Sequence, residues 1–204
     1  MKQFPRLIPI FPLSGVIYFP KTNLPLNIFE QRYLDLVNDT VKKDKLMGMI
    51  QEKRDGKDIY KIGCLGKISE FKKSEDGRII INLTGITRFE ILEERKNAKL
   101  YREFIVDYKK FTTDLNPPKK EDANIEFLMK KAESFFKKNG LLLNWREFEK
   151  LDIMQRINTL AMIAPITNEE KQKLLESISL TEKINSLKEI IEFYLHQAFS
   201  KSQT

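Results

Sequence analysis

Histidine and cysteine are nearly absent from this 204-residue chain, which has one of each. His196 and Cys64 cannot supply the clustered ligands of a metal site, and His-based acid–base catalysis would depend on a single ring near the C-terminus. Cys64 has no partner for an internal disulfide and lies in a strand-like stretch, which predicts a buried, unreactive thiol. We therefore expect a protein without catalytic residues, metal or cofactor.

Long apolar runs and phosphate-binding loops are lacking as well. No stretch reaches the ~20 apolar residues of a membrane helix, and the start, Met-Lys-Gln-Phe-Pro-Arg, is unlike a signal peptide. The nearest match to a phosphate-binding loop, residues 63–67, has the wrong glycine spacing and lies in a strand pattern. These absences predict a cytoplasmic protein that neither spans a membrane nor hydrolyses nucleotides.

Positive charge is in moderate excess, with 36 Lys and Arg against 29 Asp and Glu and a formal net charge of +7. Clustered basic residues would favour nucleic-acid binding, but here the two signs are interleaved, as on an ordinary solvated surface. One group keeps RNA binding open as an alternative, because its members fall on neighbouring predicted strands with Phe71 among them. This group consists of Lys67, Lys72, Lys73, Arg78 and Arg88.

Prolines interrupt the opening of the chain at positions 5, 9, 12, 20 and 25. Each proline removes a backbone donor, so we expect extended segments at a sheet edge or in bulges. Asn27 and Glu30 have the spacing of a capping box, which predicts that a helix begins at Asn27. The expected buried stripe of that helix consists of Phe29, Tyr33, Val37 and Val41, with Leu34 beside it.

The apolar run Val16, Ile17, Tyr18 and Phe19 lies between Gly15 and Pro20. One interpretation is an exposed patch that captures an extended peptide together with an adjacent sheet edge. The other is that Tyr18 and Phe19 fill the mouth of a β-barrel, since large aromatic side chains are well buried on average.

The rest of the sequence changes period once. Short strand patterns with glycine bends and hairpin turns extend to about residue 112, and the odd positions from 79 to 91 are mostly apolar. A polar, proline-containing connector follows, and then four stretches have helical spacing. These helices are expected from residue 125 to 138, from 144 to about 164, from 167 through 178, and from 181 onward. The pattern predicts an α+β protein with a mostly antiparallel β-rich subdomain over 1–112 and a helical bundle over 113–204.

A set of motifs spread over nearly the whole chain resembles the Lon protease N-terminal (substrate-binding) domain family, in particular its stand-alone bacterial members that lack the ATPase and protease domains. The motifs are Pro-Ile-Phe-Pro-Leu at 9–13, Phe-Pro at 19–20, Leu-Pro-Leu-Asn-Ile-Phe-Glu-Gln-Arg-Tyr at 24–33, Ile-Gly-Cys-Leu-Gly at 62–66, Leu-Thr-Gly-Ile at 83–86 with Arg-Phe at 88–89, Leu-Ala-Met at 160–162 and Glu-Lys-Gln at 170–172. The resemblance implies a PUA-like small β-barrel with one inserted helix, followed by an α-helical bundle.

The resemblance also implies a function. It points to a non-catalytic module that binds unfolded or exposed polypeptide segments and is linked to protein quality control, with a separate ATP-dependent protease as a further partner. We take Val16, Ile17, Tyr18 and Phe19 as candidate peptide contacts, together with Arg32, which matches the family motif and is otherwise explained only by an ion pair. RNA binding through the PUA-like barrel is the alternative.

Overall fold

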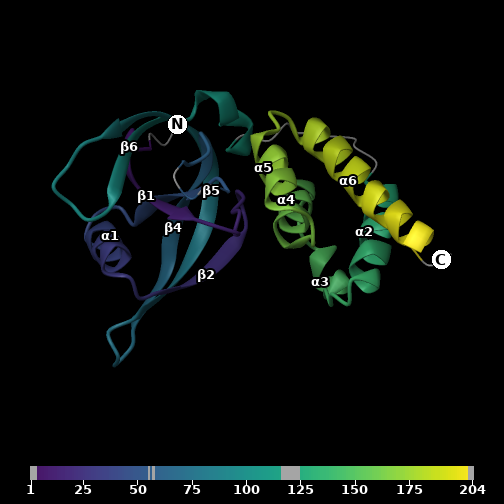
Figure 1. Ribbon diagram of the computed structural model, residues 1–204, viewed down its shortest axis with the longest axis horizontal. Helices are drawn as coiled ribbons and strands as arrows, with labels where there is room; N and C mark the ends of the chain where they lie inside the picture. The colour runs from purple at the N-terminus through teal and green to yellow at the C-terminus, as the bar shows by residue number, and fades with distance from the viewer. Residues whose placement is uncertain (1–3, 55, 57, 116–124, 202–204) are drawn as a thin grey trace. The chain divides into compact units, whose positions relative to one another are not determined.

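The computed structural model describes residues 4–54, 56, 58–115 and 125–201. The chain divides into two compact units, Met1–Pro117 and Pro118–Thr204, which are described separately below (Figure 1). Sequence periodicity placed the boundary at residue 112, where it would cut a short 3₁₀-helix, η1 (Lys109–Asp114). The division falls after η1 because this element is held to the β-rich unit by a buried ion pair.

The β-rich unit is built on a six-stranded sheet with the order β2-β5-β4-β3-β1-β6. The strands are β1 (Leu7–Leu13), β2 (Asn23–Ile28), β3 (Leu46–Gln51), β4 (Ile62–Lys73), β5 (Ile79–Arg95) and β6 (Arg102–Asp107). Strand β5 also pairs with β6 near its C-terminal end, so that β5, β4, β3, β1 and β6 form a closed circuit of pairings. Strand β2 lies outside the circuit and pairs with the first part of β5.

The sheet is mostly antiparallel, as predicted, but β1 and β3 run parallel, with Ile10 opposite Gly48. The intervening chain contains β2 and a helix, α1 (Gln31–Val41), and parallel strands require such a crossover connection. The remaining pairings are antiparallel. The expected glycine irregularity is present at Gly66, where the pairing of β4 with β5 shifts register.

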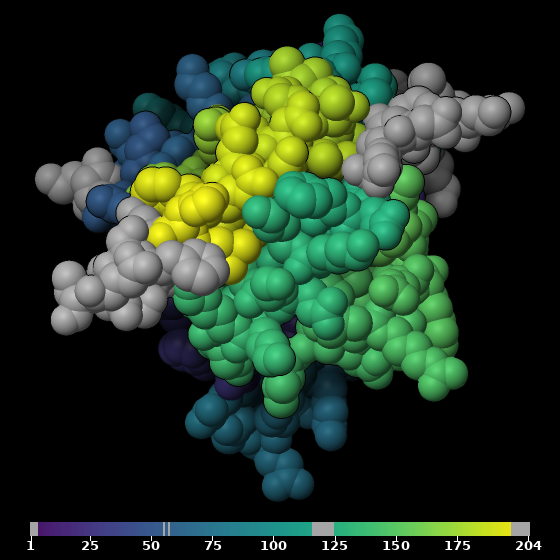
Figure 2. Space-filling view, turned by 90° about the vertical axis from the view of Figure 1, so that its right-hand side faces the viewer, coloured from purple at the N-terminus to yellow at the C-terminus, as the bar shows by residue number. Residues whose placement is uncertain are grey.

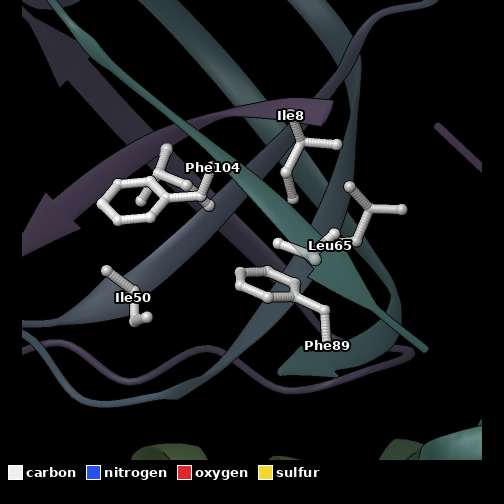
Figure 3. Close-up of a cluster of buried hydrophobic side chains, with 7 residues drawn as sticks. Ile8, Ile50, Leu65, Phe89 and Phe104 are labelled. Carbon is white, nitrogen blue, oxygen red and sulfur yellow. The ribbon is translucent and has the colours of Figure 1, made fainter. Parts of the chain in front are cut away.

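The core of this unit is a cluster of side chains contributed by all five strands of the circuit (Figure 3). The cluster consists of Ile8, Ile10, Ile50, Leu65, Phe89, Phe104 and Val106. Alternation along β5 puts Ile79, Ile81, Leu83 and Phe89 inside, as the odd-position pattern predicted. Cys64 is fully buried, as expected for a small apolar side chain.

Helix α1 begins later than its apparent capping box indicated. Asn27 belongs to β2, Glu30 is the N-cap residue, and no side chain caps the helix. The helix buries Tyr33, Leu36, Val37 and Thr40, so the Tyr33 and Val37 positions of the predicted stripe are confirmed. The prediction for Phe29 is wrong: this ring precedes the helix and 67% of it is exposed. Strand pairing of Asn27 with Ile80 outweighs the local capping preference.

The helical unit contains α2 (Glu126–Lys138), α3 (Trp145–Phe148), α4 (Ile153–Ile163), α5 (Asn168–Glu176) and α6 (Leu180–Lys201). Figure 2 shows α2 in teal green beside α6 in yellow, a pairing supported by the ion pair between Lys131 and Glu192. The interior of the unit consists mainly of Leu128, Phe135, Phe136, Phe148, Ile157, Leu160, Leu174, Leu187 and Ile191.

The single helix expected from residue 144 onward is divided in two. Asn144 accepts a hydrogen bond from the backbone of Glu147 and caps the four-residue helix α3. Asp152 and Gln155 then form a complete capping box that starts α4. A second strong N-cap ends one helix and begins another even though the apolar stripe continues. At the end of α5 the predicted buried position Ile178 is exposed, because the helix stops at Glu176.

Candidate functional site

The segment predicted as an exposed apolar patch is mostly interior. Ile17, Tyr18 and Phe19 are 3%, 2% and 0% exposed, and only Val16 is intermediate. The prediction of an exposed patch is therefore wrong, and the burial of Tyr18 and Phe19 that the alternative interpretation expected is confirmed. The cause is close packing of the backbone on β5, where a Cβ at Gly85 would overlap the carbonyl oxygen of Phe19.

Hydrogen bonds fix this segment further. Thr22 donates through its hydroxyl to the Phe19 carbonyl at 2.7 Å, and Lys21 donates its backbone N–H to Gly85 at 3.0 Å. The Tyr18 hydroxyl lies inside the unit with no hydrogen-bond partner among the described residues, and burial raises the pKa of this phenol well above its usual range. The segment is thus mainly structural, which leaves Arg32, with 49% of its side chain exposed, as the candidate most accessible to a ligand.

Arg32 lies at the mouth of a hollow of about 280 Å³ between the C-terminal ends of β1 and β2 and the start of α1. The lining of this hollow is largely apolar, with three charged side chains. It consists of Phe11, Pro12, Leu13, Ser14, Leu26, Asn27, Ile28, Phe29, Glu30, Arg32, Tyr33 and Glu52. A mostly apolar hollow with a few polar groups is the usual character of a ligand-binding site.

Two contacts hold the aromatic side chains on the inner side of the hollow. The rings of Phe11 and Tyr33 pack with their centroids 4.0 Å apart, and the Tyr33 hydroxyl donates to the Pro12 carbonyl at 3.1 Å. Burial is the main cause of a raised pKa for the Tyr33 phenol, so this group stays protonated and remains a donor near neutral pH. The two rings therefore keep their positions on the inner side of the hollow.

The rim carries both charge and exposed apolar surface. Arg32 forms an ion pair with Glu30 at 3.0 Å, and its guanidinium lies 4.4 Å from the centroid of the Tyr33 ring. Both charged side chains are about half exposed, at 49% and 47%, so a ligand can reach them. The exposed Phe29 ring completes the rim, and sequence reasoning missed it because it assigned this ring to the buried face of α1.

One of the five basic residues that suggested RNA binding is not accessible to a ligand, and the other four are exposed. Arg88 is buried at 3% exposure and pairs with Asp114 at 2.7 Å, so phosphate cannot reach it without unfolding of this region. Lys67, Lys72, Lys73 and Arg78 are exposed, although Arg78 pairs with Asp76 at 2.9 Å. Phe71 is 38% exposed beside them. Within the described part of the chain, no helix is long and apolar enough to span a bilayer.

A β-rich unit with a rimmed apolar hollow, followed in sequence by a helical unit, defines a mixed α+β protein. The chain belongs to the ATP-dependent protease La (LON) substrate-binding domain family, whose model matches residues 7–192. This match confirms the family that the opening motifs indicated.

Curated relatives give the same assignment. The chain is 24% identical to the Lon protease of Bacillus thuringiensis over 92% of its length, and 25% identical to that of Buchnera aphidicola over 91%. It spans about a quarter of the length of these relatives, 24% and 25% respectively. The similarity therefore concerns a substrate-binding domain within longer proteases.

Solved structures agree on the fold. The Lon N-terminal domain protein from Xanthomonas campestris matches with a TM-score of 0.64 at 20% identity, covering 89% of this chain and 96% of that one. The N-terminal domain of the Mycobacterium avium complex Lon protease matches with a TM-score of 0.68 at 15% identity, covering 91% and 98%. The α+β arrangement of a sheet followed by helices is therefore that of a Lon N-terminal domain.

Proposed function

We propose that this chain is a non-catalytic polypeptide-recognition module that holds apolar side chains of unfolded or exposed segments in the hollow beside Arg32. The observation that carries the proposal is the hollow itself, with the paired rings of Phe11 and Tyr33 inside and Phe29 exposed at its rim. Its position within the region matched by a substrate-binding family supports the assignment.

The chemistry of the hollow suits a short apolar segment. An apolar side chain that enters is removed from water against rings that are already ordered, so little further ordering is needed. The neighbouring Arg32 and Glu30 present a cation and an anion within reach of peptide carbonyl and N–H groups. Because these contacts demand an apolar residue and a backbone but no particular sequence, the site would accept many segments.

Two finer features belong to the same proposal. The closed circuit of β5, β4, β3, β1 and β6 is consistent with a small PUA-like barrel. The similarity to Lon proteases supports association with an ATP-dependent protease, to which this module would deliver the bound segment.

The proposal is tested by binding of reduced, carboxymethylated α-lactalbumin, a permanently unfolded protein, at low and at physiological salt. Retention at both salts, with loss of a mixed-sequence single-stranded RNA as salt rises, would support polypeptide recognition, since phosphate contacts weaken steeply with salt. Salt-resistant RNA binding without capture of the unfolded protein would replace this function by an RNA-binding one on the β4–β5 face.

Phe29→Ser is expected to weaken binding of carboxymethylated α-lactalbumin about tenfold, because the rim of the hollow loses its exposed ring. The thermal midpoint should hardly change, since this ring is two-thirds exposed, at 67%. Fluorescence anisotropy of the labelled α-lactalbumin measures the affinity.

The matched control is Phe193→Ser, which removes a ring of similar exposure, 55%, from α6 of the helical unit. This variant should bind the unfolded protein as the unmodified chain does. Equal losses of affinity in Phe29→Ser and Phe193→Ser would show that any exposed aromatic ring contributes to binding. The hollow would then not be the binding site.

A further inference from the structure

The outer edge of β2 has no strand paired with it among the described strands, because β2 ends the strand order and pairs only with β5 (Figure 1). The direction of its backbone groups follows from one hydrogen bond. Gly85 donates its N–H to the Thr22 carbonyl at 2.9 Å, so these two residues form a hydrogen-bonded pair. This pair directly precedes the pair of Asn23 with Thr84, which is the first of the β2–β5 ladder. In an antiparallel ladder, hydrogen-bonded and non-hydrogen-bonded pairs alternate.

The alternation assigns each residue of β2 to one side. Leu24, Leu26 and Ile28 direct their N–H and C=O groups toward β5, whereas Asn23, Pro25 and Asn27 direct theirs away from it. Pro25 has no N–H, which explains how a proline fits within a strand. Asn23 and Asn27 keep their donors, and neither backbone N–H has a hydrogen-bond partner in the part of the chain that the structure describes.

The neighbouring edge of β1 offers no comparable donors. The Leu13 carbonyl accepts from the backbone N–H of Glu52 at 3.2 Å, so Leu13 faces β3 and Pro12 faces the opposite side. Pro12 has no N–H, and its carbonyl already accepts from the Tyr33 hydroxyl. Of the two strand ends that border the hollow, only β2 can form a new ladder.

Asn27 connects this edge to the hollow, since it belongs to the outward-facing set and also lines the hollow. We propose that an extended polypeptide segment adds as a strand to the outer edge of β2, bonded at Asn23 and Asn27, with one apolar side chain in the hollow. The inference rests on the proposed function and specifies its binding mode. It requires alternate backbone amides of the bound segment, because these are the groups that face β2.

An N-methyl scan tests this binding mode. Ten-residue peptides that tile the α-lactalbumin sequence are first compared by anisotropy, and the tightest binder is then methylated at one backbone nitrogen at a time. Strand addition predicts an alternating result, in which methylation of every second central residue lowers affinity at least tenfold and methylation of the others changes it less than threefold. A uniform profile would overturn strand addition while leaving capture by the hollow intact.

Variants of Asn27 provide the test from the protein side. Asn27→Pro removes the outward N–H but none of the backbone hydrogen bonds between β2 and β5. We expect about a tenfold loss of peptide affinity. Asn27→Ala is the matched comparison, because it removes the same side chain but keeps the N–H, and we expect its loss of affinity to be clearly smaller than that of Asn27→Pro. Equal losses in the two variants would assign the effect to the side chain and overturn the proposal.

The outcomes distinguish failure of the proposed function from failure of the proposed binding mode. If neither carboxymethylated α-lactalbumin nor any of its peptides binds, the proposed function fails and the binding mode fails with it. If peptides bind without the alternating profile, only the binding mode fails. Sedimentation of the free protein tests whether the edge of β2 binds a second copy of the chain. A dimer that dissociates in the Asn27→Pro variant, together with peptide binding that methylation does not change, would assign the edge to that second copy and overturn the inference.

Discussion

Arg88→Met is expected to lower the free energy of unfolding of the β-rich unit by about 3–5 kcal/mol, because it leaves the Asp114 carboxylate buried without its cation. The guanidinium donates to both carboxylate oxygens, at 2.7 and 2.9 Å, and the backbone N–H of Arg88 donates to the same group at 2.9 Å. The Arg88 guanidinium also lies 4.2 Å from the centroid of the buried Phe111 ring. Urea unfolding measures the loss of unfolding free energy, and amide hydrogen exchange in β5 measures it at the strand that carries Arg88.

Two further variants make this prediction specific. Arg102→Met breaks an ion pair with Glu94 of the same length, 2.7 Å, whose side chains are 40% and 45% exposed, so it should cost at most about 1 kcal/mol. Arg88→Met combined with Asp114→Leu removes both buried charges and should recover much of the stability. If Arg88→Met costs no more than Arg102→Met, the buried pair does not hold η1 in place.

Phe19→Ala is expected to destabilise the β-rich unit by about 3–5 kcal/mol, the usual cost of truncating a fully buried phenylalanine. Tyr18→Phe should be neutral or slightly stabilising, because it removes a buried hydroxyl that has no hydrogen-bond partner among the described residues. Thermal unfolding monitored by circular dichroism distinguishes the two variants. A stable Phe19→Ala protein with weakened peptide capture would contradict the interior role and restore this segment as a binding site.

Much of the fold could be predicted from local patterns. The odd positions of β5 from Ile79 to Phe89 are buried because strand side chains alternate, and Asn139 with Gly140 ends α2, where Gly140 has φ +67°. These features depend on neighbours in sequence. The parallel pairing of β1 with β3 could not be predicted in this way, since it depends on where the chain returns after α1.

The candidate site was predictable only in part, through Arg32. Phe11, Phe29 and Tyr33 meet at the hollow because β1, the end of β2 and α1 converge there, and no spacing in the sequence encodes that meeting. The Asn27–Glu30 spacing misdirected the interpretation, because strand pairing holds Asn27 in β2 and leaves Phe29 outside the helix. The proline at 25 was the most useful signal, since it indicated an edge strand.

The Arg88–Asp114 pair also bears on how the protein would respond to mechanical load. Asp114 is the last residue of η1, and the chain continues from there toward the helical unit. A pulling force applied along the chain from that direction reaches the β-rich unit at η1 before it reaches β6. The buried ion pair would therefore transfer the pull to the middle of β5, at Arg88, where β5 is paired with β4.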